Sequence, residues 1–478
     1  MFWIAIECPH LPLDLLGRGL PDAQQQPLVV HDDDARRPSV IAATAAAQRF
    51  GVQAGMPLAA AQSLADGLRC HARRPDDEAA ALERLATCCY RYSSWVSLAA
   101  ARPENGWHCP AILIEAAASE RLFGPPKALA DRIRHMLDRQ GWRTRTGGAP
   151  VPDAARLAAA RGQWFPAGRP LAAALADTPV AQLPLDTASL VTLHGAGLKT
   201  LGAVLRLPRK ALTRRLGPTA LQAIERLLGT RADPPTPFHP ADSFTSALEL
   251  PMETRQVRGL LFPLKRLVAE LAATLIARDA AVASLTLHFD GEDGQRQSLT
   301  VSPAQPLREA PRLLELISER LHRLTLERPV RRIAVQAEQL LPHAEQQPGL
   351  FGPAPGESAD ISRLRDRLEA RLGREAIRCL GGDGDHRPER RGLELPIDQP
   401  RPAAPQPARP SWLMSPPQPC DIGDYRILAG PERIETGWWD GEDCRRDYYV
   451  VADSAGSLLW AYRAYKPTPG WFLHGVFG

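Results

Sequence analysis

Short apolar runs and stretches of helical spacing alternate along the first third of the chain. The runs have the length and composition of strands, and they lie at residues 3–7, 95–98, 112–114 and 143–146. Between them, residues 76–92 and 127–137 carry apolar side chains at helical spacing. Strands that alternate with helices predict an α/β sheet with helices packed against it.

Small residues dominate residues 39–58, SVIAATAAAQRFGVQAGMPL, which follow a predicted strand at residues 28–31. The alanine-rich middle of this stretch predicts a helix, and Gly51 and Gly55 mark a loop before Pro57 starts the next helix. A helix made of such small side chains can lie close to a sheet or to a ligand.

Residues 165–235 are helical in character and contain a glycine turn. Leu193, Gly195 and Gly197 form the hxGxG pattern of a helix-hairpin-helix, and a helix is predicted at residues 198–205. Such a turn lets the backbone approach a phosphate, and the next helix offers free N–H donors at its N-terminus. Basic residues lie nearby: Lys199, Arg206, Lys210, Arg214 and Arg215. The pattern predicts binding to the DNA backbone, and an ordinary helical bundle is the alternative.

A second mixed domain is predicted at residues 241–341. Its pattern is helix, strand, strand, helix, strand, with one more strand expected at residues 243–250. This order predicts two helices on one face of a four-stranded sheet. Arg331 and Arg332 lie on the last strand, where we expect them to face a DNA backbone.

The remainder of the chain changes composition twice. Nine of the 24 residues from 396 to 419 are proline, which predicts a stiff extended linker. Beyond it, strands are predicted at residues 434–439, 445–451, 458–465 and 471–476, and five of the ten tryptophans lie from residue 412 onward. A small β-rich module is expected, whose tryptophans form either a partner-docking surface or a compact core.

Composition narrows the class of protein. With 478 residues and 44% hydrophobic side chains, the chain can bury several cores. The net charge of +4 is small, so nucleic-acid contacts must come from local basic clusters. Eight cysteines without a CxxC pair predict neither a disulfide framework nor a zinc site, and a reducing cytoplasm is expected. Glu7 and Pro9 interrupt the opening apolar run, so we expect no signal peptide and no membrane association.

Residues 39–58 resemble the fingers of Y-family DNA polymerases, whose usual form is AxSYEARKFGVRSGMP, and the chain is most similar to the ImuB branch of that family. The resemblance implies an α+β multidomain fold shaped as a right hand, with a C-terminal tail that ends in a small β-rich module. The expected parts are palm at 1–24 and 76–164, fingers at 25–75, thumb at 165–240, little finger at 241–341, clamp-binding segment and amphipathic helix at 342–395, linker at 396–419 and β module at 420–478.

The resemblance also identifies where catalytic residues would lie. The family's first strand usually reads VDMDxFFAxVE, and IAIECPHLPLD places Ala5 at its metal-binding aspartate, Glu7 at a second acid and His10 at the aromatic that gates the sugar. The second motif, SIDEAFLDVTGSxRLFG, is met by HCPAILIEAAASERLFG, so Pro110 and Ala111 occupy the paired Asp-Glu position.

Phosphate contacts are replaced as well, because Ala45, Gln48 and Pro152 stand where the family has tyrosine, arginine and lysine. Two Mg²⁺ ions and a triphosphate would lack compensating charges there. We therefore expect no catalytic residue, no metal and no cofactor, and we expect the remaining acids, Glu7 and Glu115, to be structural. An active Y-family polymerase with a divergent metal site is the alternative.

Partner contacts are expected in the tail. Gln347, Leu350 and Phe351 fit the QxxLF form of bacterial sliding-clamp ligands, while the similar stretch at 182–185 is interpreted as the entry to the thumb. The motif DHRPERR, residues 385–391, is similar to one in ImuB-like tails, and its role does not follow from the sequence.

The ImuB resemblance implies a cytoplasmic, nucleoid-associated and non-catalytic adaptor in error-prone translesion synthesis. Its implied partners are a DNA primer-template, the sliding clamp, an error-prone C-family DNA polymerase and a RecA-like ImuA-type protein. A stand-alone DNA-binding or structural protein is a third possibility.

Overall fold

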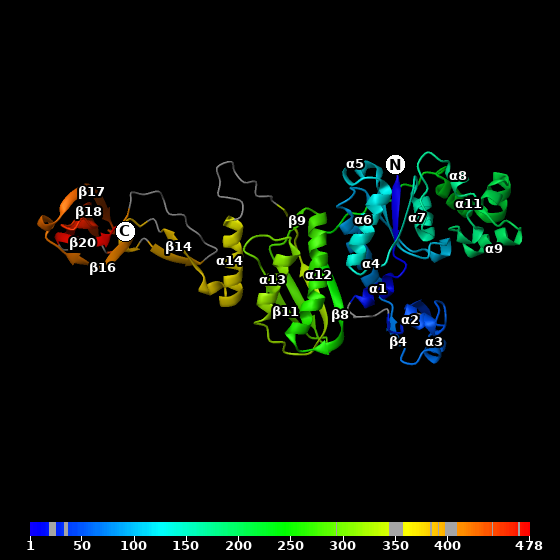
Figure 1. Ribbon diagram of the computed structural model, residues 1–478, viewed down its shortest axis with the longest axis horizontal. Coiled ribbons are helices and arrows are strands. Elements are labelled where there is room, and N and C mark those ends of the chain that lie inside the picture. The colour runs from blue at the N-terminus through cyan, green and yellow to red at the C-terminus, as the bar shows by residue number, and fades with distance from the viewer. Residues whose placement is uncertain are drawn as a thin grey trace. The chain divides into compact units, whose positions relative to one another are not determined.

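The structure is a computed structural model that describes residues 1–18, 25–32, 37–292, 294–343, 357–382, 385–390, 392–396, 409–441, 443–466 and 469–478. The chain divides into two compact units, Met1–Asp366 and Arg367–Gly478. Figure 1 shows the elements of both units along the chain. Among the described residues, no helix has both the length and the apolar character needed to cross a bilayer.

A four-stranded antiparallel sheet, called the central sheet here, organises the first 160 residues. Its order is β5-β6-β1-β7. The strands are β1 (Trp3–Glu7), β5 (Val96–Ala99), β6 (Ala111–Glu115) and β7 (Arg145–Ala149). The helices are α1 (Leu11–Gly17), α4 (Pro75–Cys89), α5 (Glu120–Phe123), α6 (Pro126–Arg139) and α7 (Pro152–Arg161).

The two faces of the central sheet are covered by different helices (Figure 1). Side chains alternate along a strand, so Ile4 and Ile6 of β1 pack with α4 and α6, while Trp3 and Ala5 pack with α7. Helix α7 lies so close that a Cβ added at Gly147 would be 2.1 Å from its backbone. This contact explains why the last strand is β7, which contains two glycines, rather than the predicted run at residues 143–146.

A small separate sheet, of order β3-β2-β4, forms from residues 28–72. Its elements are β2 (Leu28–His31), β3 (Val40–Ala43), α2 (Ala45–Arg49), α3 (Leu58–Leu64) and β4 (Arg69–Ala72). Thr44 caps α2 by accepting the N–H of Ala47 at 3.4 Å, and its hydroxyl also donates to Gln26 O at 2.8 Å. The cap fixes where the alanine-rich helix begins.

The helical region from residue 165 to residue 240 contains α8 (Leu171–Ala174), α9 (Thr187–Gly195), α10 (Leu201–Leu205) and α11 (Arg209–Leu228). Its leucines join the core on the α7 side of the central sheet. The predicted helix at residues 198–205 begins only at Leu201. Gly197 turns with φ +74°, and Thr200 then caps α10 by accepting the N–H of Ala203, so the residues between are needed for the turn.

A second sheet, of order β11-β10-β12-β8, is backed by two helices as predicted. Its elements are β8 (Phe244–Thr254), α12 (Val257–Ala277), β10 (Leu285–Asp290), β11 (Arg296–Val301), α13 (Ala310–Leu321) and β12 (Val330–Ala337), with the short strands β9 (Ala280–Ala281) and β13 (Leu341–Pro342) beside it. Five fully buried leucines of α12 anchor this core, each worth roughly 1.5–3 kcal/mol: Leu260, Leu264, Leu267, Leu271 and Leu275.

Helix α14 (Glu357–Leu372) buries a polar side chain and exposes its apolar ones. Asp366 is buried and accepts the N–H of Ala304 at 2.6 Å, and Arg363 pairs with Glu315 at 3.0 Å. The apolar positions of the helix are exposed instead: Ile361, Leu364, Leu368 and Leu372. The helix therefore docks on the second sheet's domain through polar contacts.

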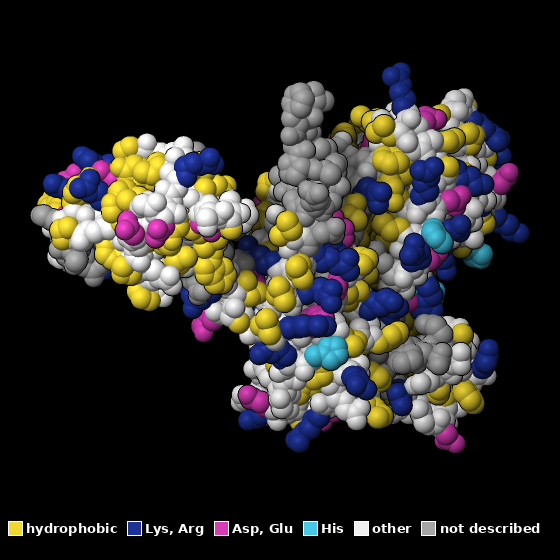
Figure 2. Space-filling model, turned by 60° about the vertical axis from the view of Figure 1, so that its left-hand side comes forward, with side chains coloured by type: hydrophobic (Ala, Val, Ile, Leu, Met, Phe, Trp, Pro, Cys, Tyr) yellow, Lys and Arg dark blue, Asp and Glu magenta, His cyan; other side chains and the backbone are white. Residues whose placement is uncertain are grey.

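The second unit holds the hairpin β14 (Arg378–Gly382) and β15 (Gly392–Pro396) and a five-stranded antiparallel sheet of order β16-β20-β19-β18-β17. We call residues 412–478 the C-terminal module. Its strands are β16 (Trp412–Pro419), β17 (Arg426–Thr436), β18 (Cys444–Ala452), β19 (Leu458–Lys466) and β20 (Gly470–Val476). Hydrophobic side chains gather on the visible face of the module, the left-hand lobe of Figure 2.

Two predictions for this unit were wrong. The proline-rich stretch at residues 396–419 is not a linker throughout, because Trp412–Pro419 is strand β16. It is an edge strand that pairs with β20 alone. Its other side needs no backbone donor, so prolines, which lack an N–H, are tolerated in it. The strand predicted at residues 434–439 ends at Thr436, because Gly437 turns with φ +89° and places both following tryptophans in a loop.

Candidate functional site

The positions at which the resemblance implies metal ligands, Ala5, Pro110 and Ala111, lie together at the end of β1. Glu7 lies directly opposite Ala111 of β6 and opposite Arg145 of β7. Ala5 shares this face two residues earlier and is fully buried, and Pro110 accepts the N–H of Cys8 at 3.0 Å. One carboxylate, two methyl groups and a proline ring therefore meet at this corner.

Glu7 is the acid that remains at this corner, and it is 4% exposed. Burial raises the pKa of its carboxyl to about 7, although Arg156 and Arg145 act in the opposite direction. A carboxyl with this pKa is only partly ionised at neutral pH. A lone carboxyl also gives a divalent cation few oxygen ligands, whereas Mg²⁺ requires an octahedral set.

An arginine fills the space beside Glu7. Arg156 extends from α7, and its guanidinium carbon lies 4.0 Å from the ring centroid of Trp107. Its Nη2 donates to the carbonyl oxygens of Ala100 and Cys109, both at 3.2 Å. Burial lowers the pKa of this guanidinium, yet arginine keeps its charge at any neutral pH. The corner therefore holds a fixed cation.

A cavity of about 370 Å³ lies beside Arg156, between β5, α7, α11 and residues 233–236. Its charged lining is balanced, with Arg102, Arg156, Arg226, Asp153, Asp186 and Asp233. Arg226 bridges Asp153 at 3.2 Å and Asp233 at 3.4 Å. A balanced lining does not provide the excess positive charge that a triphosphate requires.

The residues at this corner do not fit a pair of magnesium ions. Such a site needs several converging carboxylates, whereas Ala5, Pro110 and Ala111 provide no side-chain oxygen and Arg156 adds a positive charge. In the part of the chain that the structure describes, no group of three or more His, Cys, Asp or Glu residues could hold a metal ion. We therefore derive no chemical step through a metal.

The other predicted substitutions lie on α2, which packs on the separate sheet β3-β2-β4, and on α7. Ala45 and Gln48 are exposed on α2, and the amide of Gln48 donates to the carbonyl of Ala43 at 3.2 Å. Pro152 is the first residue of α7, the helix that carries Arg156. Glu115 accepts N–H groups from Phe2, Ala117 and Ala118 at 3.1–3.2 Å, so it caps a turn at the far end of β6.

The glycine turn between α9 and α10 is open to solvent. Gly195, Gly197 and Lys199 are exposed, and a Cβ at either glycine would meet nothing within 4 Å. The exposed side chains of Lys210, Arg214 and Arg215 follow on α11. Backbone N–H groups and mobile cations are thus available together in one helical region.

The two arginines predicted on the second sheet differ in their surroundings. Arg331 is exposed at a bulge of β12. Arg332 lies between Asp290 of β10 and Glu249 of β8, its direct cross-strand neighbours. Both of these carboxylates pair with other arginines, Glu249 with Arg74 at 2.6 Å and Asp290 with Arg296 at 2.7 Å. Arg332 is only half-exposed, whereas Arg331 is open to solvent.

Comparison with known families matches two parts of the chain. The impB/mucB/samB family model matches residues 16–160, and the model of that family's C-terminal domain matches residues 246–350. Together they cover more than half of the chain. Protein ImuB of Caulobacter vibrioides is 28% identical over 474 residues, which span 90% of this chain and all of that protein. The chain belongs to the impB/mucB/samB family and is an ImuB homologue.

Solved structures are similar as well. DinB from Sulfolobus solfataricus has 18% sequence identity and a TM-score of 0.41, and the insertion ternary complex of Dbh DNA polymerase has 19% and 0.42. Each alignment covers 71% of this chain and 99% of the other. This ImuB homologue has an α+β multidomain fold with a β-rich C-terminal region.

Of the two glutamine motifs in this ImuB homologue, the structure describes only the one at residues 182–185. Gln347, Leu350 and Phe351 lie outside the described residues. The second match is part of the fold, because Leu183 and Leu185 are buried and Gln182 accepts a hydrogen bond from Arg161 at 2.6 Å. Residues 182–185 are therefore not an extended peptide available to a clamp.

Sequence reasoning missed Arg156 and Trp107. An arginine four residues after Pro152 has no special signal in the sequence, and Trp107 comes from a loop. One signal could have pointed to Arg156: it lies four residues after Pro152, which stands where the family has its phosphate-binding lysine.

Proposed function

We propose that this ImuB homologue is a non-catalytic adaptor in error-prone translesion synthesis after DNA damage. The observation that carries the proposal is Arg156, a buried cation beside the one remaining carboxylate at the corner where a Y-family polymerase binds its metals. A guanidinium fixed there repels divalent cations, and Ala5 and Ala111 provide nothing to offset it.

The remaining surfaces support holding rather than chemistry. The open turn at Gly195 and Gly197, with the basic side chains of α11, suits weak binding to the backbone of a primer-template. Gln347, Leu350 and Phe351 would attach the protein to the sliding clamp. The C-terminal region would recruit an error-prone C-family polymerase, which performs the synthesis, and a RecA-like ImuA-type protein.

Primer extension tests the catalytic part of the proposal. Purified protein should incorporate no nucleotide on a primed template with Mg²⁺ or Mn²⁺, while an active Y-family polymerase does so under the same conditions. The Glu7→Ala variant is the matched control, because Glu7 is the acid left at the corner. Incorporation by the wild type that Glu7→Ala abolishes would establish an active polymerase and overturn the adaptor role.

A further inference from the structure

The sheet of the C-terminal module has two unlike faces, because side chains alternate along each of its strands. Tyr448 and Tyr462 belong to the core on one face, and Tyr449 belongs to the core on the other. We call them the Tyr448 face and the Tyr449 face. Their contacts show which of the two is open to a ligand.

The Tyr448 face is engaged by the segment at residues 385–390, which holds most of the motif noted in the sequence. Glu389 of this segment pairs with Arg446 of β18 at 2.5 Å. Arg446 also donates to the hydroxyl of Tyr448 at 3.1 Å, and that hydroxyl shares a hydrogen bond with Nδ1 of His474 at 2.8 Å. These polar groups are therefore already bound within the protein.

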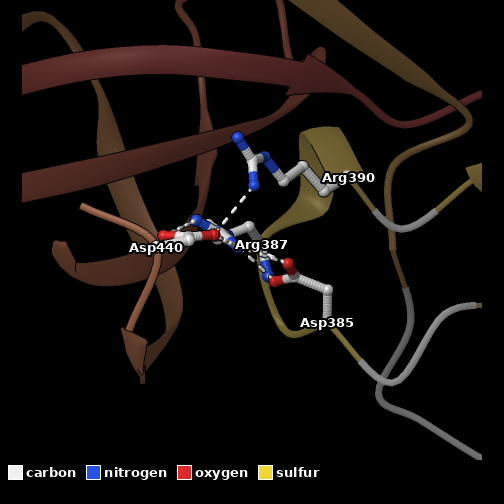
Figure 3. A network of polar contacts seen from close by, with 4 residues as sticks. All are labelled: Asp385, Arg387, Arg390 and Asp440. Atoms are coloured by element: carbon white, nitrogen blue, oxygen red, sulfur yellow. Dashed lines mark hydrogen bonds and ion pairs between the residues drawn. The ribbon is translucent and has the colours of Figure 1, made fainter. Parts of the chain in front are cut away.

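The same segment is fastened to the turn between β17 and β18. Arg387 donates from Nη1 to Oδ1 of Asp440 at 3.1 Å and from Nη2 to Oδ2 at 2.6 Å, and Arg390 donates to the same Oδ2 at 2.9 Å. Figure 3 shows the two arginines converging on Asp440. The motif at residues 385–390 thus has a structural role, and its arginines are engaged by a carboxylate instead of a ligand.

Aromatic rings and an arginine gather on the Tyr449 face. Tyr449 of β18 and Trp471 of β20 lie on either side of β19, and their ring centroids are 5.2 Å apart. The small side chain of Ala461, directly opposite Tyr449, leaves room for this contact. Both rings are partly exposed, and Tyr465, farther along β19, is 37% exposed. We call Tyr449, Trp471 and Tyr465, together with Arg463, the aromatic platform.

Arg463 gives the aromatic platform its positive charge. Its guanidinium carbon lies 5.3 Å from the centroid of the Tyr465 ring, and none of the ion pairs among the described residues involves it. The acid opposite it on β18, Asp447, is already bound, because Arg433 donates to both of its oxygens at 2.7 and 2.9 Å. These hydrogen bonds hold the pKa of the Asp447 carboxyl below its usual value. The Asp447–Arg433 pair is neutral, so Arg463 leaves the platform with a net positive charge.

Part of the Tyr449 face is covered by residues 420–425, which connect β16 to β17. Their apolar side chains pack on the core of this face, which includes Val451 and Leu473. Arg463 and Tyr465 remain exposed. The aromatic platform is therefore the part of this face that a ligand can reach.

The chemistry of the aromatic platform favours a single-stranded nucleic acid. Aromatic rings on a sheet surface offer their faces to unpaired bases of any sequence, and an arginine among them can contact a phosphate or stack on a base. Bases in a duplex are already paired and stacked, so they cannot use such rings. Residues 412–478 contain six Lys and Arg residues against nine Asp and Glu residues, so stacking must supply most of the affinity.

We propose that the aromatic platform of the C-terminal module binds single-stranded DNA by stacking unpaired bases on Trp471 and Tyr449, with Arg463 contacting a phosphate. The site is separate from the basic side chains of α11, and it goes beyond the recruiting role proposed for the C-terminal region. It holds the unpaired template strand that extends past a primer end.

Fluorescence anisotropy with the full-length chain tests the stacking. The probe is a fluorescein-labelled thymidine oligonucleotide of about 15 nucleotides, long enough for one binding site. The Lys210→Ala/Arg214→Ala/Arg215→Ala background removes the other proposed DNA contact. In that background Trp471→Ala should weaken binding about 10-fold, the effect of losing one stacked base. Trp412→Ala is the matched control and should change affinity less than about twofold, because Trp412 is 74% exposed beside Val476, at the far end of β20.

Two further measurements separate stacking from folding. Trp471→Phe keeps an aromatic ring and should retain affinity within about threefold of the wild-type platform. A blunt duplex of the same length should bind Trp471→Ala as it binds the parent, since its bases are not available to the rings. Near-ultraviolet circular dichroism of each variant checks that the aromatic core of the module is retained.

Arg463→Ala tests the phosphate contact separately. It should reduce the slope of log affinity against log salt by about 0.7, the value for one phosphate of a single strand. Arg426→Ala removes another exposed arginine, at the start of β17 opposite Ala452, and should leave the slope unchanged. Arg463→Ala removes no core side chain, so it decides the assignment even if Trp471→Ala fails to fold.

Several outcomes would overturn the assignment. An oligonucleotide that does not bind in the triple background, or that binds Trp471→Ala and Arg463→Ala as tightly as their parent, would show that the platform holds no single strand. Equal losses for the oligonucleotide and the blunt duplex would show a backbone contact without stacking. Unchanged oligonucleotide binding with lost pull-down of the C-family polymerase would make the platform a protein-docking face instead.

Discussion

The polymerase-like body and the C-terminal module use charge and apolar surface in opposite ways. The whole chain has 58 Lys and Arg residues against 54 Asp and Glu residues, yet the module from residue 412 onward is acidic. The positive excess therefore lies entirely in the residues that precede it. In the body, the aromatic Trp107 lies under a buried cation, whereas in the module Trp438 and Trp439 project into solvent.

This contrast is what the proposed adaptor role leads us to expect. In the body, Ala5, Pro110 and Ala111 leave Glu7 and the buried Arg156 at one corner of the central sheet. In the module, Trp438 and Trp439 are exposed in the turn between β17 and β18. Under the proposed function, the corner of the body lacks metal ligands and the C-terminal region recruits partners.

Removing everything from Glu357 onward should give the largest effect and separates the two regions directly. The truncated protein retains the clamp motif and the helix-hairpin-helix, so it should still bind the clamp and primed DNA. Pull-down of the C-family polymerase and the RecA-like protein should be lost completely. Recovery of both proteins with the truncated chain would show that the body, not the tail, is the docking platform.

Within the body, substitutions in the clamp motif should have the largest effect, and they should lower affinity for the sliding clamp. Gln347→Ala, Leu350→Ala and Phe351→Ala together should weaken clamp binding by at least about 100-fold, because an amide contact and two pocket-filling side chains are lost. Surface plasmon resonance on immobilised clamp measures this. Gln182→Ala, in the second glutamine match, is the control and should leave clamp affinity unchanged. Unchanged binding by the triple variant, with normal damage-induced mutagenesis, would favour a stand-alone DNA-binding protein.

Glu7 should make the stability of the body depend on pH. Below pH 4.5 the carboxyl is protonated in both the folded and the unfolded chain. Between pH 4.5 and about 7 only the unfolded chain releases the proton, so Glu7 makes the folded state progressively less stable as pH rises. Glu7→Gln removes this penalty and should stabilise the body by up to about 3 kcal/mol at pH 8, relative to its effect at pH 4.

Thermal unfolding of wild type and Glu7→Gln across this pH range measures the difference. Glu104→Gln, at an exposed position, is the matched control. A Glu7→Gln effect that is the same at pH 4 and pH 8 would contradict the buried, partly protonated carboxyl described above, and it would reopen the question of cation binding at this corner.

The smallest effects are expected for DNA contacts. Lys210→Ala, Arg214→Ala and Arg215→Ala together should lower affinity for primed duplex about 10-fold at low salt and reduce the salt slope by about three. Arg332→Ala is the control and should change affinity less than about twofold, since it removes one half-exposed cation instead of three exposed ones. Fluorescence anisotropy across a salt series measures both. Equal losses for the triple variant and Arg332→Ala would place the main DNA contact on the little finger.

Much of the fold could be predicted because local patterns report it directly. The leucines of α12 repeat at helical spacing, and β10 alternates Leu285, Leu287 and Phe289 into the core, so both elements follow from periodicity. The central strand β1 was equally clear, because Trp3 to Ile6 form an apolar run of strand length, as its full burial requires.

The rest depends on tertiary placement, which local rules do not contain. Nine prolines argued for a linker, yet the position of β16 at a sheet edge makes its prolines acceptable. Arg387 meets Asp440 across 53 residues, so no spacing rule links them. Arg156 is one arginine on an ordinary helix until α7 is folded against the central sheet.

The positions of proline in the C-terminal module have a consequence for solubility. The two outer strands of its sheet both contain prolines, Pro431 in β17 and Pro416, Pro417 and Pro419 in β16. A proline has no N–H to offer a newly arriving strand, so each of these prolines interrupts the row of donors that such a strand would need. The prolines therefore oppose growth of the sheet at both of its edges, in a module that also exposes Trp438 and Trp439 to water.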